Sequence, residues 1–338
     1  MTNSTPYISF VVTSRNDNHG GGLLLRMQTF VNCLMDQCRR RDLRAELIIV
    51  EWNPPSDQLP LADALSWPGT AHCPVRIVQV SPELHRRFEY SDRLPLFQMI
   101  AKNVGIRRAR APFVLATNID ILFSEELITY LALRRLDERM MYRTDRHDIP
   151  AALPTDLPVD RLLEFCRRNS LRIYKPKGVV DAKTGIYDEG SITWKTRIHD
   201  IYMVLSRKGV EKRLHTHACG DFTLMAKSHW FRIRGYPELP MLSMNVDSLG
   251  YQNAYFAGAR ERVLKSPMQV YHMEHSTAGW TPEGDGALVA ANSNGIPHLD
   301  YMQYRTFAVR MRKERQPIEF NDKKWGLADE VLPEVMRG

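Results

Sequence analysis

Long apolar runs, cysteine pairs and targeting segments are all missing from this sequence of 338 residues. No run reaches the roughly 18 apolar residues at which a membrane-spanning helix would be considered. The five cysteines contain no C-x-x-C pair, which argues against a zinc knuckle and a disulfide framework, so we expect reduced thiols. The first residues form neither a basic segment nor a long apolar core, so we expect no signal peptide and a cytoplasmic protein.

Two glycine-rich nucleotide signatures are missing as well. Residues 20–22 are three glycines before an expected helix, but no G-K-[ST] follows them, so they are not a P-loop. They also lack the G-x-G-x-x-G spacing and the ribose-binding acid of a dinucleotide fold. We interpret them as a turn, with the presentation of backbone N–H groups to a phosphate as the alternative.

Acidic residues are fewer than basic ones, which gives a formal net charge of +7 and a pI near 9.1. This balance favours anionic partners such as nucleotide phosphates or an anionic membrane surface, and peripheral contact at the inner face of the membrane is one option. The alternative is that the arginines simply form solvated helix faces. No basic arm or aromatic–basic motif is present, so nucleic acid is not an expected partner.

Strand and helix patterns alternate over the first 125 residues. Short β-branched runs predict strands, and apolar residues at helical spacing predict helices. The alternation predicts an α/β fold with a Rossmann-like, mainly parallel sheet flanked by helices. The predicted strands are Ile8–Thr13, Glu46–Val50, Val75–Val80 and Phe113–Thr117, and the predicted helices are Leu23–Arg41 and Leu96–Arg108.

The pattern is less regular after residue 125, and it divides the chain into four parts. Residues 1–143 form the regular α/β half, 144–219 an insertion or flap, 220–300 a second half of the same domain, and 301–338 an extension. Predicted helices are a Ser124-capped helix through Leu136, Val159–Asn169, one ending near Gly258, and Ala328–Met336; predicted strands are Met140–Arg143 and Met268–His272.

Asp120 is the most informative acid in the chain. It follows the fourth predicted strand within Asn118-Ile119-Asp120, and apolar residues surround it. Ligands of open α/β sheets bind beyond the carboxyl ends of the strands, so this position suits a cation or phosphate site. A hard carboxylate is a ligand that Mg²⁺ or Mn²⁺ prefers. The alternative is a turn aspartate just before the Ser124 cap.

Five segments in this order resemble the nucleotide-sugar glycosyltransferases of the GT-A fold, particularly those of the family 2 type. Ala101–Ile106 is similar to their A-R-N-x-G helix motif, and Asn118–Asp120 stands where they carry D-x-D. The departures are Asn118 for the first acid, Val246 for the acid before Asp247, and Lys102 for the usual arginine. The other matching segments are Ile8–Asn16, Glu46–Glu51 and Phe222–Glu238, the last followed by Asp247.

The resemblance implies transfer of a sugar from a nucleoside-diphosphate sugar, a UDP-sugar first, to a carbohydrate or lipid-linked acceptor. It implies a donor pocket in which Glu51 binds the base or ribose and Arg15 meets a phosphate. The other residues that it places around the donor are Thr13, Ser14, Lys102, Asn103, Asn118 and Asp120. A nucleotidyltransferase and a non-catalytic GT-A-like binding protein for nucleotides or carbohydrates are the alternatives.

A divalent cation, Mn²⁺ or Mg²⁺, is the expected cofactor, with Asp120 as its first ligand. A late histidine completes the metal shell in many GT-A enzymes, and His272 or His275 could supply it here. Strand alternation places these two on opposite faces, and we prefer His275 because it opens the loop that leads to Trp280. Trp280 is either a sugar platform or lid residue, or a core residue.

Asp247 is the predicted catalytic base of an inverting reaction, because the resemblance places a base there. A carboxylate beside the acceptor hydroxyl can take its proton as the new bond forms. The alternative, compatible role is that of an N-cap for the helix that follows. Asp221 is the second candidate, either as a base or as a sugar contact.

Overall fold

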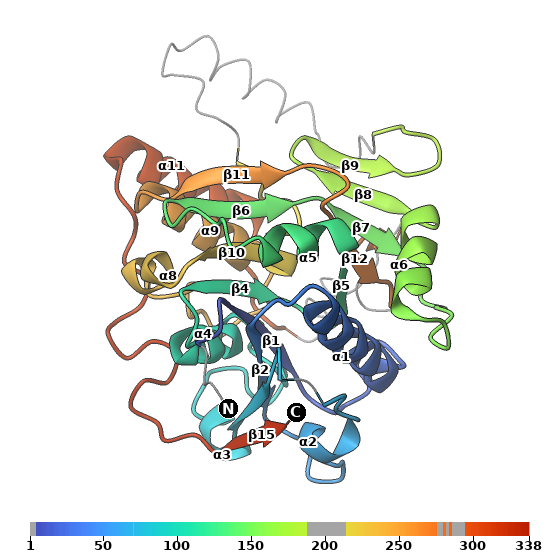
Figure 1. Ribbon diagram of the computed structural model, residues 1–338. Helices are drawn as coiled ribbons and strands as arrows, with labels where there is room; N and C mark the ends of the chain where they lie inside the picture. Colours follow the sequence, from blue (N-terminus) through green and yellow to red (C-terminus); the bar gives the residue numbers. More distant parts are fainter. Residues whose placement is uncertain are drawn as a thin grey trace.

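An eight-stranded sheet runs through the centre of the molecule, with strand order β11-β6-β10-β4-β1-β2-β3-β15 (Figure 1). The computed structural model describes residues 5–69, 71–187, 214–275, 280–281, 284–285 and 295–337. The strands of this sheet are β1 (Ile8–Ser14), β2 (Ala45–Trp52), β3 (Val75–Val80), β4 (Phe113–Thr117), β6 (Met140–Thr144), β10 (Phe222–Ala226), β11 (Arg260–Leu264) and β15 (Glu334–Arg337).

Strands β4, β1, β2 and β3 are mutually parallel, as the alternation predicted. Helices α1 (Leu23–Arg40) and α4 (Gln98–Arg108) cover opposite faces of these strands (Figure 1). Alternate strand residues supply two cores, so that Phe10 packs on the α1 side and Val11 on the α4 side. Gly105 lets α4 approach closely, because a Cβ there would lie 2.5 Å from Cγ1 of Val11.

A second sheet, which the sequence did not predict, has the order β5-β12-β7-β8-β9. It joins a strand that directly follows Asp120 to three strands of the predicted insertion. Its members are β5 (Ile121–Phe123), β7 (Arg146–Ile149), β8 (Arg172–Lys175), β9 (Gly178–Asp181) and β12 (Val270–Met273). The rest of the insertion, residues 188–213, lies outside the described residues.

The helical predictions in the first two thirds of the chain are confirmed. Helices α5 (Glu125–Ala132) and α6 (Val159–Arg168) occupy the predicted segments, and Ser124 caps α5 by accepting a hydrogen bond from Leu127 N. The remaining helices are α2 (Leu61–Ala64), α3 (Pro82–His85), the 3₁₀ turn η2 (Cys219–Asp221), α8 (Lys227–Ile233), α9 (Val246–Phe256) and α11 (Tyr301–Glu314).

The predicted C-terminal helix, Ala328–Met336, is wrong. The segment begins as a turn and irregular chain and ends in strand β15, which pairs antiparallel with β3, with Glu334 opposite Val78. Glu334 also accepts a hydrogen bond from Nε of Arg76 at 2.6 Å. An open sheet edge offers unpaired N–H and C=O groups, and pairing with it outweighs the local helix preference of the segment. Helix α11 was not predicted; Asp300 and Gln303 form its capping box.

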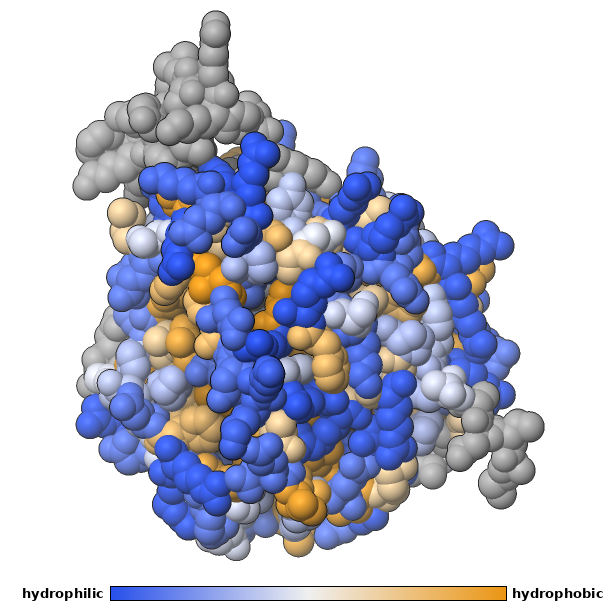
Figure 2. All heavy atoms as spheres, turned by 90° about the vertical axis from the view of Figure 1, so that its left-hand side faces the viewer, coloured by the Kyte–Doolittle hydropathy of each residue, from blue (hydrophilic) through white to orange (hydrophobic). Residues whose placement is uncertain are grey.

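The surface around α11, α8 and α4 is mostly hydrophilic, with small scattered apolar patches (Figure 2). Within the described ranges, no helix is both long and apolar enough to cross a membrane.

Candidate functional site

Asp120, His272 and His275 come together where the two sheets meet. The chain leaves β4 at Thr117, turns through Asp120 and enters β5. Strand β12 runs antiparallel to β5 and pairs His272 with Ile121, while Met273 N donates to the carbonyl of Asp120 at 3.1 Å. The junction therefore brings a late histidine strand beside the aspartate at the carboxyl end of a parallel strand, as the sequence predicted.

The three side chains form a compact group of ligand atoms. The carboxylate Oδ2 of Asp120 lies 3.3 Å from Nε2 of His275 and 3.8 Å from Nε2 of His272. One ligand atom from each residue lies within 4.8 Å of the others. Strand alternation led us to expect the histidines on opposite faces, but β12 ends at Met273 and His275 turns back toward Asp120. Both histidines therefore reach the group.

The group fits a divalent cation. Oδ1 of Asp120 is buried and has no hydrogen-bond partner among the described residues. A buried carboxylate oxygen without a partner is costly, and a cation would satisfy it. One carboxylate and two imidazole nitrogens suit Mn²⁺ better than Mg²⁺, which prefers oxygen ligands.

Asp120 is held in its ionised form. Burial acts to raise the pKa of this carboxyl, but the hydrogen bond from His275 and the electrostatic attraction of the neighbouring basic groups outweigh it. The pKa therefore lies well below its ordinary value, so the carboxylate is ready to bind a cation without first losing a proton.

The three glycines at 20–22 form a turn in which Gly20 lies against His275. All three have positive φ values, between 62° and 74°, which confirms the predicted turn. A Cβ on Gly20 would lie 2.4 Å from Nδ1 of His275, whereas nothing lies within 4 Å of a Cβ on Gly21. Only glycine at position 20 leaves room for the histidine ring, so this turn helps to place His275.

A second group of charges surrounds Lys102. Its side chain is fully buried, and Nζ donates to the carbonyl of Gly220 at 2.7 Å. Burial lowers the pKa of Lys102 to about 8, although the charges of Asp221 and Asp247 act in the opposite direction. The ammonium therefore lies among carboxylates inside the protein rather than on an exposed surface. Its positive charge offsets the repulsion between those carboxylates.

Asn118 donates a hydrogen bond that an aspartate at this position could not donate. Its Nδ2 donates to Oδ1 of Asp221 at 2.6 Å, and its Oδ1 accepts from Nε2 of Gln98 at 2.9 Å. Both ends of the Asn118 amide are therefore engaged by neighbouring side chains. An amide can donate to Asp221 where a carboxylate would repel it, which gives a physical reason for asparagine at this position.

Asp247 lies in the first turn of α9, but it is not the N-cap. Asn245 holds the N-cap position. The carboxylate of Asp247 accepts from the backbone N–H groups of Gly220 and Ser248, each at 2.7 Å. Asp221 is instead paired with Nη1 of Arg146 at 2.7 Å. The two candidate bases therefore flank Gly220 and differ in their partners.

Several of the predicted donor-pocket side chains are engaged by other parts of the fold. Glu51 is buried and accepts from Leu61 N at 2.7 Å and Gln79 Nε2 at 2.9 Å. Asn103 turns away and exchanges two hydrogen bonds with the backbone of Tyr236. Thr13 bonds Val50 O, Ser14 bonds Sδ of Met27, and Arg15 bonds Pro95 O and pairs with Asp17.

Two residues near the site were missed in the sequence. Oδ1 of Asp148 lies within hydrogen-bond distance of Nδ1 of His272, at 3.2 Å, and Arg146 forms ion pairs with both Asp148 and Asp221. The only signal was the charged alternation of R-H-D-I at 146–149, which reads equally well as a solvated edge strand. The side chain of Trp280 lies outside the described residues.

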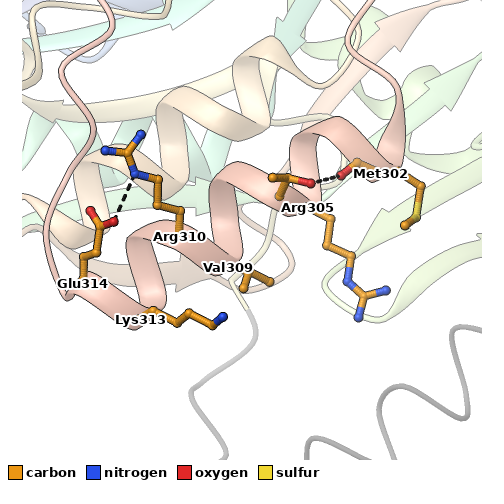
Figure 3. Close-up of a pocket in the computed structure, with 7 residues that line it drawn as sticks. Met302, Arg305, Val309, Arg310, Lys313 and Glu314 are labelled. Carbon is orange, nitrogen blue, oxygen red and sulfur yellow. Dashed lines mark hydrogen bonds and ion pairs between the residues drawn. The ribbon is translucent and has the colours of Figure 1, made fainter.

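A separate hollow of about 440 Å³ lies along α11 (Figure 3). Figure 3 shows Arg305 and Lys313 extending from the same helix as Met302 and Val309. Its lining residues are Met302, Arg305, Thr306, Val309, Arg310, Lys313 and Glu314, and none of them is a predicted site residue.

Comparison with known proteins gives distant structural likenesses. No protein-family model matches the sequence, and no curated protein matches it. The structure is similar to S. aureus TarS 1-349, with 13% identity and a TM-score of 0.42 over 79% of this chain. The same TarS piece in complex with UDP gives 12% and 0.38 over 78%. The catalytic domain of Drosophila beta1,4galactosyltransferase 7, in complex with xylobiose, gives 10% and 0.35 over 80% of this chain and 71% of that one.

The chain spans 60% of TarS 1-349 and 37% of a longer TarS chain. These values leave the activity to be argued from the site itself.

Proposed function

We propose that this protein is a glycosyltransferase of the GT-A type, which moves a sugar from a nucleoside-diphosphate sugar to a carbohydrate or lipid-linked acceptor. The observation that carries the proposal is the convergence of Asp120, His272 and His275 at the carboxyl end of β4. A UDP-sugar is the donor to test first. The adjacent acids, Asp221 and Asp247, supply candidates for the second half of the chemistry.

Asp120, His272 and His275 would hold Mn²⁺ or Mg²⁺. A cation bound there would offset the negative charge that develops on the departing diphosphate. The chain's own contribution is a ligand set that is already assembled, with the carboxylate of Asp120 ionised. Lys102 keeps three carboxylates close together at the same edge, because its buried ammonium attracts Asp221, Asp247 and Asp120.

Asp247 is the proposed base. Among the described residues it accepts hydrogen bonds from two backbone N–H groups and forms no ion pair, whereas Asp221 is held by a guanidinium. The ion pair with Arg146 engages the carboxylate of Asp221 and makes it the less available of the two for proton transfer. The acceptor hydroxyl would attack the anomeric carbon as the bond from that carbon to the diphosphate oxygen breaks. The hydroxyl proton would pass to Asp247, and the configuration would invert.

A basic helix supports the predicted contact with an anionic membrane. Met302 and Tyr301 of α11 are 65% and 53% exposed, and Arg305, Arg310 and Lys313 lie along the same helix. Helices that lie on anionic bilayers carry both exposed apolar residues and Lys or Arg. In a sedimentation assay, vesicles containing phosphatidylserine should bind the protein, and added salt should release it. Neutral vesicles should bind it less. Equal binding to neutral vesicles would contradict this contact.

The proposal is tested by calorimetric titration of UDP and GDP, with and without Mn²⁺, into wild type and Asp120→Ala. We expect nucleotide binding that requires both Mn²⁺ and Asp120. Asp92→Ala is the control, because Asp92 is a well-exposed loop aspartate paired only with its neighbour Arg93 among the described residues. This control should bind as wild type does.

The alternative functions give different results. A non-catalytic binding protein would bind nucleotide but neither hydrolyse nor transfer a sugar from any nucleoside-diphosphate sugar. A nucleotidyltransferase would release pyrophosphate from a nucleoside triphosphate. Absence of nucleotide binding in wild type would contradict the proposed function.

A further inference from the structure

The imidazole of His272 is held from behind by a buried carboxylate. Nδ1 of His272 lies 3.2 Å from Oδ1 of Asp148, and Nε2 lies on the other side, 3.8 Å from Oδ2 of Asp120. The side chains of His272 and Asp148 are only 5% and 1% exposed. A neutral imidazole that donates Nδ1–H to a carboxylate leaves Nε2 as its free lone pair. That lone pair then faces the candidate cation site.

The sheet register fixes this arrangement. Strands β12 and β7 are parallel, and His272 pairs directly with Asp148. Paired residues project from the same face of a sheet, so the register places the carboxylate of Asp148 beside the ring of His272. A register slip of one residue would move Asp148 to the opposite face. The second sheet therefore determines how His272 meets the site.

Two arginines hold Asp148 in turn. Nε of Arg146 lies 3.0 Å from its Oδ1, and Nε of Arg172 lies 3.1 Å from its Oδ2. Arg146 also pairs with Oδ2 of Asp221 at 2.7 Å, and its guanidinium lies over the ring of Tyr174. Arg146 thus connects the carboxylate behind His272 with the carboxylate that Asn118 binds.

We propose that Asp148 is a positioning residue for the cation site, which holds His272 with Nε2 toward Asp120. This inference rests on the proposed function, because it concerns the cation ligands of that site. Carboxylates behind metal-binding histidines fix the tautomer and orientation of the ring, and their loss typically weakens metal binding by about 10- to 100-fold. Asp148 need not touch the cation or the substrate.

The test is calorimetric titration of Mn²⁺ alone into wild type and Asp148→Asn, without nucleotide. We expect Asp148→Asn to weaken Mn²⁺ binding about 10-fold or more. Asp145→Asn is a matched control, because Asp145 lies 3.3 Å from a different buried histidine, His215, which is not in the cation group. This control should retain the wild-type affinity. Thermal melting of each variant shows whether the protein remains folded.

The outcomes separate the two proposals. If wild type and Asp148→Asn bind Mn²⁺ equally, Asp148 has only a structural role, and the cation site of the proposed function stands. If wild type binds no Mn²⁺, both the cation site and the role of Asp148 are overturned.

A measurement on wild type covers the case in which Asp148→Asn does not fold. ¹⁵N NMR of histidine-labelled protein, with His272 assigned through His272→Gln, should show the proton on Nδ1. A proton on Nε2 of the neutral ring would overturn the inference.

Discussion

Replacing Asn118 with aspartate would restore the D-x-D pattern of the GT-A resemblance, yet we predict that Asn118→Asp harms this protein. The amide of Asn118 donates to Oδ1 of Asp221 at 2.6 Å. An aspartate would remove that hydrogen bond and place two carboxylates together. Even after relaxation to about 4 Å, two such charges repel by about 4 kcal/mol at an effective dielectric constant of about 20. Lys102 and Arg146 would offset part of this repulsion.

The expected loss is about 2 to 4 kcal/mol in the free energy of unfolding at pH 8. The pH dependence follows from the like charges, which raise the pKa of one carboxyl in the folded state. A raised folded-state pKa means that the penalty is absent below the unfolded pKa of about 3.9 and grows as the pH rises. At pH 5 the repulsion can cost at most about 1.5 kcal/mol, because one carboxyl takes up a proton.

Urea denaturation of wild type and Asn118→Asp at pH 5 and pH 8 measures this difference. Asn32→Asp is the control, because Asn32 is an exposed residue of α1 whose Oδ1 accepts from Gln28, a bond that aspartate would keep. A deficit of less than about 0.5 kcal/mol at pH 8, or one that does not change with pH, would refute the electrostatic reasoning. Tighter Mn²⁺ binding by Asn118→Asp would show instead that position 118 supplies a cation ligand.

Three further predictions follow from the same site. Lowering the pKa of Lys102 from 10.5 to about 8 corresponds to about 3 kcal/mol, a cost fully present below about pH 8 and relieved as the pH rises toward 10.5. Lys102→Met should remove this rise in stability, which urea denaturation at pH 7 and pH 10 would measure against wild type. Gly20→Ala should weaken Mn²⁺ binding because its Cβ collides with His275, whereas Gly21→Ala, with a similar φ and open space, should not. Equal effects in calorimetry would contradict this. Asp247→Asn should abolish sugar transfer and retain nucleotide binding, and an unchanged turnover would exclude Asp247 as base.

The sequence predicted the elements whose signals are local. Strands β1 to β4 and the helices α1 and α4 follow from runs and spacings of apolar residues that need no distant partner, whereas the short helices α2 and α3 were not predicted. The last described strand, β15, could not be recognised, because its strand conformation depends on pairing with β3, which is far away in the sequence. Tertiary pairing of this kind routinely overrides a short helical preference.

The candidate site was predictable to a similar extent. Asp120 was a candidate because it follows a buried strand, and the two histidines were candidates because the GT-A resemblance implies a late histidine ligand. The directions of Asn103 and Glu51 did not follow from sequence, since their partners, Tyr236 and Gln79, come from other elements. Asp148 was missed because its contact with His272 depends on the register between β7 and β12, which no local sequence pattern contains.

The late pairing of β15 also has a consequence for how the chain is made. Arg76 on β3 and Glu334 on β15 are 258 positions apart. At synthesis rates of about 5 to 20 residues per second, β3 would wait roughly ten to fifty seconds on the ribosome with its outer edge uncovered. An uncovered edge strand invites pairing with other chains. Nascent chains of this protein would therefore be most prone to association, and most dependent on chaperones, until the final strand emerges.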